Sequence, residues 1–423
     1  MRAKFPQTPN KKENNPNMTT QPNITKRWGI LAVGVGTMLF AGILYAWSIL
    51  KTPFAAELGY ESSVLALSFT LAMCFFCLGG FLSGQLVRRL GTRLTILAAG
   101  LLAGLGFVLT SRLGIECPPL LYLTYSLLSG LGIGMAYIVI ISTVNAWFPD
   151  RRGLSSGALM MGFGASTLLL GKIADRLFQS ELGWRSTYIV IGIAIAAVIA
   201  LSSLVIRAPA KDTVLPQKKP SKSARRENFE PRDYTPAEMV RRFTFWRAFL
   251  ALVCLTAVGN SVISFARDLA LSVGAEAALA TTLVGVLAVC NGLGRIITGA
   301  VFDAMGRRFT MIAASVLTIA AAAVTLLAVS IGSLPLCIVG LCLTGLSYGT
   351  SPTVSSAFSA AFYGQKHFAT NLSITNFNLM VASFIATACS SLQTASGGYT
   401  APFILLLSLS AVALALNFSI KKP

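Results

Sequence analysis

Apolar residues run along most of this chain in long stretches that short polar segments interrupt. A helix needs about 20 consecutive, mostly apolar residues to cross the core of a bilayer, and twelve stretches reach that length. They lie at about 28–50, 63–86, 94–112, 119–146, 154–174, 185–206, 245–266, 278–301, 309–331, 335–361, 370–392 and 400–419. The pattern predicts an all-α membrane protein with twelve transmembrane helices.

Polar segments divide these stretches into two sets of six. Residues 1–27 are polar and are predicted to form a disordered cytoplasmic N-terminus. Residues 207–243 are basic and contain several prolines, which is typical of a cytoplasmic linker. The expected domains are a six-helix bundle over 28–206 and a second over 244–419, followed by a cytoplasmic tail at 420–423.

The two sets of stretches share an internal repeat. An offset of 215 residues aligns GQLVRRLGTRLT, from Gly84, with GAVFDAMGRRFT, from Gly299. The same offset aligns LSGLGIG, from Leu128, with LTGLSYG, from Leu343. Because one offset serves two distant segments, the repeat predicts two pseudo-symmetric six-helix bundles. Repeats of this kind place a substrate at their interface, near the middle of the bilayer.

Charged residues are few and unevenly placed. They make up 12% of the chain, against about 25% in soluble domains, so a soluble fold is excluded. If both termini are cytoplasmic, 27 of the 34 Lys and Arg residues lie on the cytoplasmic side, and Arg295 lies inside a helix. The six at outer helix ends are Lys51, Arg112, Lys172, Arg176, Arg185 and Arg267. This asymmetry predicts a multi-pass protein of the cytoplasmic membrane with both termini inside. It explains the net charge of +19 without nucleic-acid binding.

The repeated segment after the second and eighth helices resembles the loop motif G-x-x-x-D-R-x-G-R-R of the major facilitator superfamily. The resemblance implies that this loop gates the inner face of the protein. Arg88 stands where the motif has Asp, whereas Asp303 keeps the acid in the second copy. The expected gating residues are Gly84, Arg88, Arg89, Gly91, Arg93, Gly299, Asp303, Gly306, Arg307 and Arg308.

Two further stretches resemble the oxalate:formate antiporter family and, more loosely, the monocarboxylate transporters. One is GILYAWSILKTPFAAELGY, from Gly42 to Tyr60, and the other is FPDRRGLSSGALMMGFGAS, from Phe148 to Ser166. The resemblance implies a transporter of the major facilitator fold with a small organic anion as its substrate. It implies no cofactor and no metal, and we expect a monomer in the lipid bilayer.

Arg295 is the one charge that lies well inside a predicted helix. Placing Arg in a bilayer core costs at least about 2.5–3.5 kcal/mol, so such a residue usually faces a water-filled cavity, where a guanidinium can hold a carboxylate through two hydrogen bonds. The alternatives are snorkelling to the inner interface or pairing with Asp303. The position matches the helix-eight Arg that binds carboxylate in both resembled families. Asn291, four residues earlier, shares its helical face and is either a substrate ligand or a packing residue.

The predicted eleventh helix suggests which anion fits. In oxalate carriers a Lys there binds the second carboxylate, and the resemblance places that Lys at Asn378 or at the neighbouring Leu379. This segment holds no cation, and the strong polar groups near that position are Asn376 and Asn378. An uncompensated second carboxylate would cost several kcal/mol. A monocarboxylate of the lactate, pyruvate or formate type is therefore favoured, with oxalate:formate exchange as the alternative, and Asn378 is expected to donate to it.

Three tyrosines and one acid complete the expected site. The resemblance places Tyr45, Tyr137 and Tyr348 around the inner cavity, where each could donate to an anion or simply pack. Asp268, near an outer helix end, is the candidate for proton coupling. No Asp or Glu lies deep in a predicted helix, and His367, the only His, falls in an inner loop. The sequence therefore predicts a transporter and not an enzyme.

Overall fold

The computed structural model describes residues 24–115, 117–150, 152–210, 213, 215, 233–364 and 367–420. Most of the expected N-terminus, the central part of the expected linker and the last residues of the expected tail lie outside the described residues. Within the linker, α8 (Pro236–Val240) is a short helix, and the Thr235 side chain caps its first turn.

The remaining elements are all helical. In chain order they are α1 (Ile24–Ala41), η1 (Gly42–Ala46), α2 (Trp47–Leu50), α3 (Thr52–Ala56), α4 (Ser62–Thr110), η2 (Tyr122–Ser129), α5 (Gly130–Ala146), α6 (Arg152–Phe178), α7 (Gly183–Val205), α9 (Phe243–Ser272), α10 (Ala277–Ile331), α11 (Leu334–Tyr363), α12 (Phe368–Thr375), α13 (Phe377–Ser396) and α14 (Thr400–Ser419). Within the described residues no strand is present. The first helix begins at Ile24 and therefore includes four residues of the expected N-terminal segment.

Twelve membrane spans fit these helices. The described residues hold eleven helical stretches that are long and apolar enough to cross a membrane. One of them, α4, has 49 residues and contains two spans joined at Gly91. Large apolar side chains such as Leu101, Ile193 and Leu201 are more than half exposed, as expected of surfaces that face lipid. The prediction of an all-α, twelve-span membrane fold is confirmed.

The two copies of the repeated motif have the same backbone geometry. Gly91 has φ 77° and ψ 167°, and Gly306 has φ 78° and ψ 176°. Residues that carry a Cβ rarely adopt this positive-φ backbone conformation, so glycine is required at both turns. Thr95 donates to the carbonyl of Gly91, and Thr310 to that of Gly306, both at 2.8 Å. The repeat seen in the sequence is therefore a repeat in structure.

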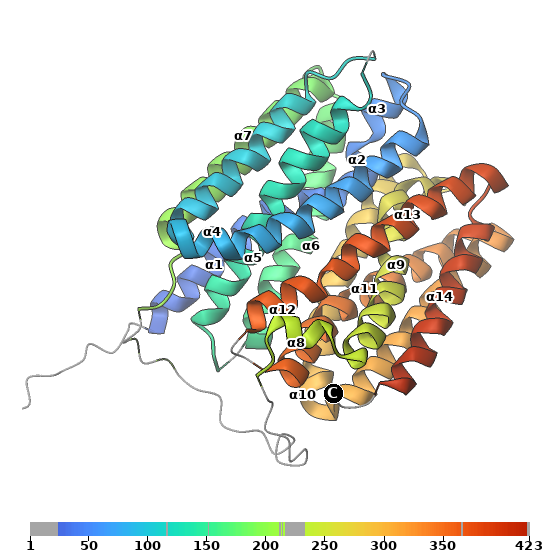
Figure 1. The fold of residues 1–423 in the computed structure, drawn as a ribbon. Coiled ribbons are helices and arrows are strands. Elements are labelled where there is room, and N and C mark those ends of the chain that lie inside the picture. Colours follow the sequence, from blue (N-terminus) through green and yellow to red (C-terminus); the bar gives the residue numbers. More distant parts are fainter. Residues whose placement is uncertain are drawn as a thin grey trace, which may run out of the picture.

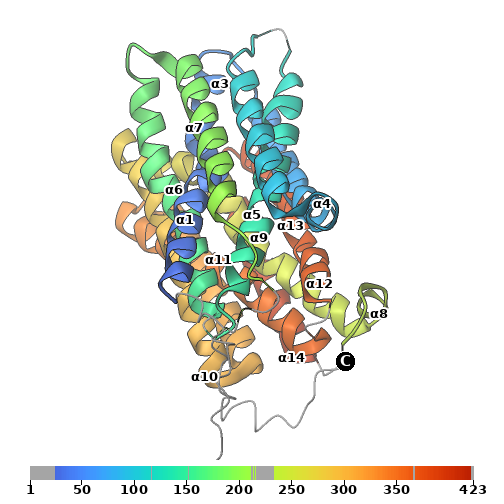
Figure 2. The same cartoon turned by 90° about the vertical axis from the view of Figure 1, so that its left-hand side faces the viewer.

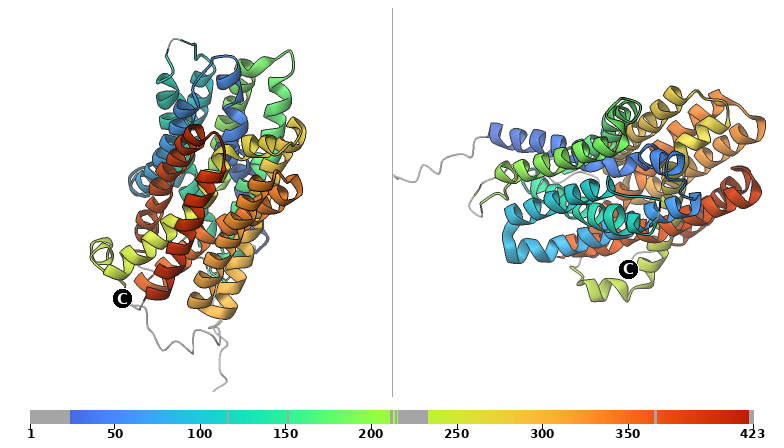
Figure 3. Two further views of the ribbon diagram at one scale, coloured as in Figure 1. Left: turned by 90° about the vertical axis from the view of Figure 1, so that its right-hand side faces the viewer. Right: turned by 90° about the horizontal axis from the view of Figure 1, so that it is seen from above.

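The helices form two groups that pack along a common interface. Figure 1 shows α1 to α7, in blue and green, beside α9 to α14, in yellow to red. We call them the N-half (24–206) and the C-half (243–419). Between them, α6 packs on α10 and α4 packs on α13, and Figures 2 and 3 show the same grouping from other sides.

The two ends of this bundle are named by the residues found there. The linker end carries α8 (Figure 1). The turns at Gly91 and Gly306 belong to the same end, because an even number of spans separates each of them from the linker. At this end the backbone N–H of Tyr234 donates to the carbonyl of Tyr363. The opposite end, where Lys51 and Asp268 meet, is called the Lys51 end.

Candidate functional site

A pocket lies between the halves. The N-half contributes three aromatic residues to its lining, and the C-half contributes the charged residue and most of the polar ones. The lining consists of Tyr45, Phe76, Tyr137, Thr256, Arg295, Tyr348, Ser351, Pro352, Asn376, Asn378 and Leu379. Residues from both halves thus share one pocket, as a substrate site at a repeat interface requires.

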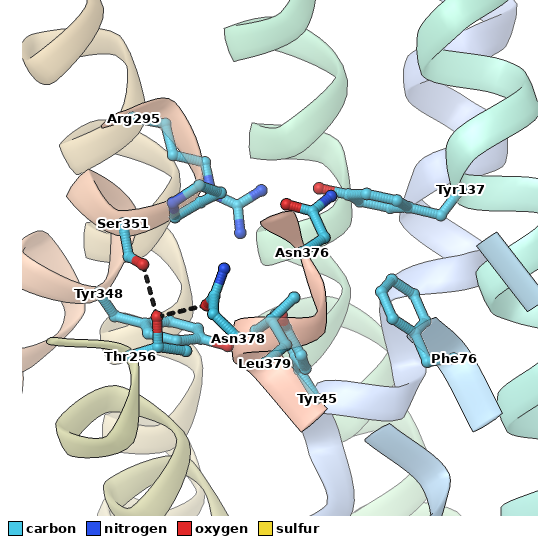
Figure 4. A pocket seen from close by; sticks show the side chains of 11 residues that line it. Tyr45, Phe76, Tyr137, Thr256, Arg295, Tyr348, Ser351, Asn376, Asn378 and Leu379 are labelled. Atoms are coloured by element: carbon cyan, nitrogen blue, oxygen red, sulfur yellow. Dashed lines mark hydrogen bonds between the residues drawn. The ribbon is translucent and has the colours of Figure 1, made fainter. Parts of the chain in front are cut away.

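Arg295 is the one charged residue among the described residues that line this pocket. Its side chain is 5% exposed, and its Nε and Nη1 atoms are buried without a hydrogen-bond partner. No ion pair with an acid is seen among the described residues. Figure 4 shows its guanidinium directed into the pocket, toward the side chains of Asn376 and Tyr137. A buried cation without a counter-ion leaves donors available to a ligand that enters.

Close helix packing holds Arg295 in place. Gly349 of α11 lies against the carbonyl of Asn291 and the amide of Arg295, so closely that a Cβ at Gly349 would overlap that carbonyl. The hydroxyl of Thr353 also donates to the carbonyl of Arg295, at 3.4 Å. The small residue at position 349 thus lets α11 fix the backbone from which Arg295 projects.

A break in the eleventh span presents two asparagines to the pocket. The helix stops at Thr375, turns at Asn376 and resumes as α13 at Phe377. The side chain of Asn378 accepts from Thr256 at 2.9 Å and donates to the carbonyl of Thr375 at 2.7 Å. The amide of Asn378 is therefore held at both its oxygen and its nitrogen, and Thr256 is itself held by a hydrogen bond with Ser351. Asn376 contacts Ser355 only through its Oδ1 atom, so its amide N–H groups remain open to a ligand.

Tyr45 and Tyr348 join the two halves through their hydroxyl groups. These lie 3.1 Å apart, and Tyr348 donates to the Oδ1 atom of Asn260 at 2.9 Å. With its proton directed to Asn260, Tyr348 accepts from Tyr45. Tyr45 lies on η1, a 3₁₀ segment that interrupts the first span. By contrast, no partner is seen for the hydroxyl of Tyr137 among the described residues, so this group can donate into the pocket.

Five of the six expected substrate-binding residues line the pocket. They are Arg295, Tyr137, Tyr45, Asn378 and Tyr348. Asn291 does not line it; it is 1% exposed, and its Oδ1 atom is buried without a partner. The long Arg295 side chain extends to the pocket, whereas the short amide of Asn291 ends beside the helix.

The expected gating and coupling residues lie away from the pocket. Arg88, Arg89 and Arg93 are exposed around the turn at Gly91. Nothing is described of the side chains of Asp303 and Arg307. At the opposite end, Asp268 pairs with Lys51 at 2.7 Å.

Several pocket residues were not expected from the sequence. Thr256 and Ser351 are hydroxyl residues in apolar helices, where such residues are too common to stand out. Pro352 had a usable signal, because a proline inside a helix leaves the carbonyl four residues earlier without its usual partner. That carbonyl belongs to Tyr348, a pocket residue. Gly259 gives Tyr348 its space, since a Cβ there would overlap the tyrosine ring.

Comparisons with known proteins agree with this architecture. The family model described as Major Facilitator Superfamily matches residues 29–386 and 248–423. The solved structure of the fucose:proton symporter of Escherichia coli aligns with a TM-score of 0.56 at 14% identity, over 92% of this chain and 98% of the symporter. At this identity the likeness shows the fold alone.

Three curated relatives are similar in sequence. YhjX of Escherichia coli, described as an uncharacterised MFS-type transporter, is 28% identical over 84% of this chain and 86% of its own length. The oxalate:formate antiporter of Oxalobacter formigenes is 27% identical over 67% of this chain and 65% of its own length. Human monocarboxylate transporter 14 is 28% identical over 40% of this chain and 34% of its own length. The match thus spans just under two thirds of the antiporter and about one third of the monocarboxylate transporter.

Proposed function

Because this chain belongs to the major facilitator superfamily, and is therefore a multi-pass membrane transporter and not an enzyme, we propose that it carries small organic monocarboxylates with Arg295 as the carboxylate ligand. Lactate, pyruvate and formate are the type of substrate intended. The observation that carries the proposal is the buried guanidinium of Arg295, which has unpartnered donors and no acid beside it among the described residues.

The charge of the pocket supports an anionic substrate. Moving a charge out of water is costly unless an opposite charge compensates it. In a pocket whose described lining holds one cation and no acid, a carboxylate provides that compensation. It can also form two parallel hydrogen bonds with the guanidinium, which adds geometric selectivity.

The remaining donors support a substrate with a single carboxylate. Tyr137 and Asn376 have donors that no described residue takes up, and they lie on the far side of the pocket from Arg295 (Figure 4). Neutral donors suit the carbonyl or hydroxyl oxygen of a substrate such as pyruvate or lactate. The resemblance to oxalate carriers places a Lys at Asn378 or at Leu379, and both of these side chains are uncharged, so a second carboxylate would lack a counter-charge.

Oxalate:formate exchange is the second candidate. It is favoured by the relative of Oxalobacter formigenes, which is described as an oxalate:formate antiporter. The two candidates differ in whether oxalate, with its two charges, can occupy the pocket.

For the transport cycle, we propose that bundles 28–206 and 244–419 rock about the pocket as alternating access requires. The motif turns at Gly91 and Gly306 would act as gate elements at the linker end. The distribution of Lys and Arg favours a cytoplasmic linker end in the cell membrane, with both termini inside. The protein would act as a monomer.

The test is counterflow in proteoliposomes loaded with unlabelled lactate, pyruvate, formate or oxalate. The wild type should accumulate labelled lactate or pyruvate against the matching internal anion, and excess oxalate should leave this uptake unchanged. Arg295→Ala should abolish saturable uptake while its elution profile and helical content stay those of the wild type. Normal saturable uptake by Arg295→Ala would overturn the site, and strong competition by oxalate would favour the second candidate.

The loop motif of the N-half provides a matched control. Arg88→Ala removes an exposed Arg of the N-half that lies away from the pocket. This variant should still bind the anion, so its melting temperature should rise with added pyruvate as in the wild type, whereas Arg295→Ala should show no such rise. Loss of the ligand-dependent rise in Arg88→Ala as well would show that the effect is not specific to the pocket.

A further inference from the structure

A second cavity lies at the Lys51 end between the halves. Its lining is polar and comes from both halves: Trp47, Lys51, Ser62, Ala66, Ser264, Phe265, Asp268, Ser390, Gln393 and Tyr399. The Tyr45 hydroxyl contact with Tyr348 belongs to the Arg295 pocket, and Trp47, two residues on from Tyr45, belongs to this second cavity. The two cavities therefore follow one another along the first span.

Lys51 bridges the halves beside this cavity. Its Nζ atom lies 2.7 Å from Oδ2 of Asp268 and 3.3 Å from the carbonyl oxygen of Ser264, both on α9. The other ion pair between described residues, Arg27 with Asp150, lies within the N-half at the linker end. The cross-half ion pair is thus found at the Lys51 end.

The carbonyl that Lys51 reaches lies at a distortion of α9. Phe265, the next residue, has φ −131° and ψ 16°, which is not helical. A kink of this kind opens the ladder of i to i−4 hydrogen bonds and leaves a carbonyl to be satisfied by another group. The ammonium group of Lys51 supplies both a counter-charge to Asp268 and a donor at the kink.

The residue beside Asp268 extends the cross-half contact to another pair of helices. Arg267 donates from Nε to the hydroxyl of Thr281 on α10 at 3.3 Å, and that hydroxyl lies 3.2 Å from Oδ2 of Asp175 on α6. Asp268 thus contacts Lys51, which follows α2, and its neighbour Arg267 contacts Thr281 of α10, which in turn reaches Asp175 of α6.

We propose that Lys51, Asp268 and the kinked turn of α9 form a latch that closes the Lys51 end and opens when the second cavity connects to the Arg295 pocket. The side chains of Lys51 and Asp268 are 17% and 39% exposed, so water can replace each partner, and the pair can break and re-form at modest cost. Closure at this end is a property of the free protein, whereas its role in substrate passage rests on the transport function proposed above.

The test is hydrogen exchange of the purified protein, followed by mass spectrometry, because it needs no substrate. Lys51→Gln and Asp268→Asn should each speed exchange in peptides covering 47–61 and 262–275 by about fivefold, the factor expected for an exposed ion pair worth about 1 kcal/mol. Peptides covering 300–312, at the linker end, should be unchanged. The charge-reversed pair Lys51→Asp with Asp268→Lys should restore slow exchange.

Lys172→Ala is the matched control. It removes a Lys from α6 near the same end, and Lys172 has no hydrogen bond or ion pair with a described residue. Its exchange pattern should equal that of the wild type. The latch would be overturned if Lys51→Gln exchanged at the wild-type rate. It would also be overturned if Lys172→Ala sped exchange as much as Lys51→Gln does. If the exchange results confirm the latch but the protein transports no carboxylate, only the proposed substrate is contradicted.

Discussion

The Arg295 pocket and the Lys51 end both hold a cation between the two halves, and they treat it in opposite ways. Arg295 is 5% exposed and has no acid beside it among the described residues. Lys51 is more exposed and has an acid at 2.7 Å across the interface. The comparison separates two uses of a charge in a membrane protein. A paired charge at a rim joins two surfaces, whereas an unpaired charge in the interior is balanced only when a ligand arrives.

The two cations also differ in how firmly their surroundings hold them. Helix packing at Gly349 and the bond from Thr353 fix the backbone of Arg295, so its site is preorganised. Lys51 follows α2, a few residues after the interruption of the first span by η1, which ends in the non-helical backbone of Ala46. It also faces a distorted turn of α9. We infer that the pocket stays similar during transport and that the rim changes its contacts.

The largest expected effect separates the two cations by chemistry. Arg295→Lys should lower carboxylate transport by about 100-fold, because an ammonium group cannot provide the parallel pair of hydrogen bonds that a guanidinium gives. The reverse change, Lys51→Arg, should alter transport by less than about threefold, because a rim ion pair needs only a positive charge. Initial rates of pyruvate counterflow measure both. Equal losses in the two variants would remove the distinction between ligand and latch.

Gly259→Ala should have the next largest effect, on the folded state itself. An added Cβ would overlap the ring of Tyr348, which is 1% exposed and cannot move without displacing its bond to Asn260. Overpacking of this kind costs about 1–3 kcal/mol, so the melting temperature should fall measurably. Gly259→Ala combined with Tyr348→Ala should recover much of the loss, because the ring is then absent. If the double variant is less stable than both single variants, the overlap is not the cause.

The fold could be predicted because the bilayer imposes a length on each span, and the glycine motif repeated at an offset of 215 residues marked equivalent turns in the two halves. The position of Arg295 in a pocket could be predicted because a charge in an apolar helix is conspicuous. Asn291 was expected to share the helical face of Arg295, but it does not line the pocket. A spacing of four residues places two side chains on one side of a helix, and the shorter of the two need not reach as far. Nothing in the sequence pairs Lys51 with Asp268, because their contact depends on how the broken first span packs on α9.

Asn378→Lys should change selectivity by about tenfold in favour of oxalate. The substitution places a second cation in the pocket, and a balanced second carboxylate avoids the cost of an unpaired charge. Inhibition of labelled pyruvate uptake by oxalate measures the shift. Asn378→Gln, which keeps the amide, is the control and should leave selectivity unchanged. No gain of oxalate inhibition in Asn378→Lys, in a variant that still takes up pyruvate, would contradict the assignment of this position to the substrate.

The smallest effect is expected from Tyr45→Phe, and it tests whether the pocket and the rim are separate. The substitution removes one hydroxyl that bonds to Tyr348 and keeps the ring against Phe163. Losing such a bond costs about 0.5–1.5 kcal/mol, so transport should change by no more than about tenfold. Because Tyr348 keeps its own bond to Asn260, hydrogen exchange at 47–61 should remain slow. Fast exchange at the Lys51 end in Tyr45→Phe would mean that the hydroxyl pair, and not Lys51, holds the halves together, and the two regions would then form a single gate.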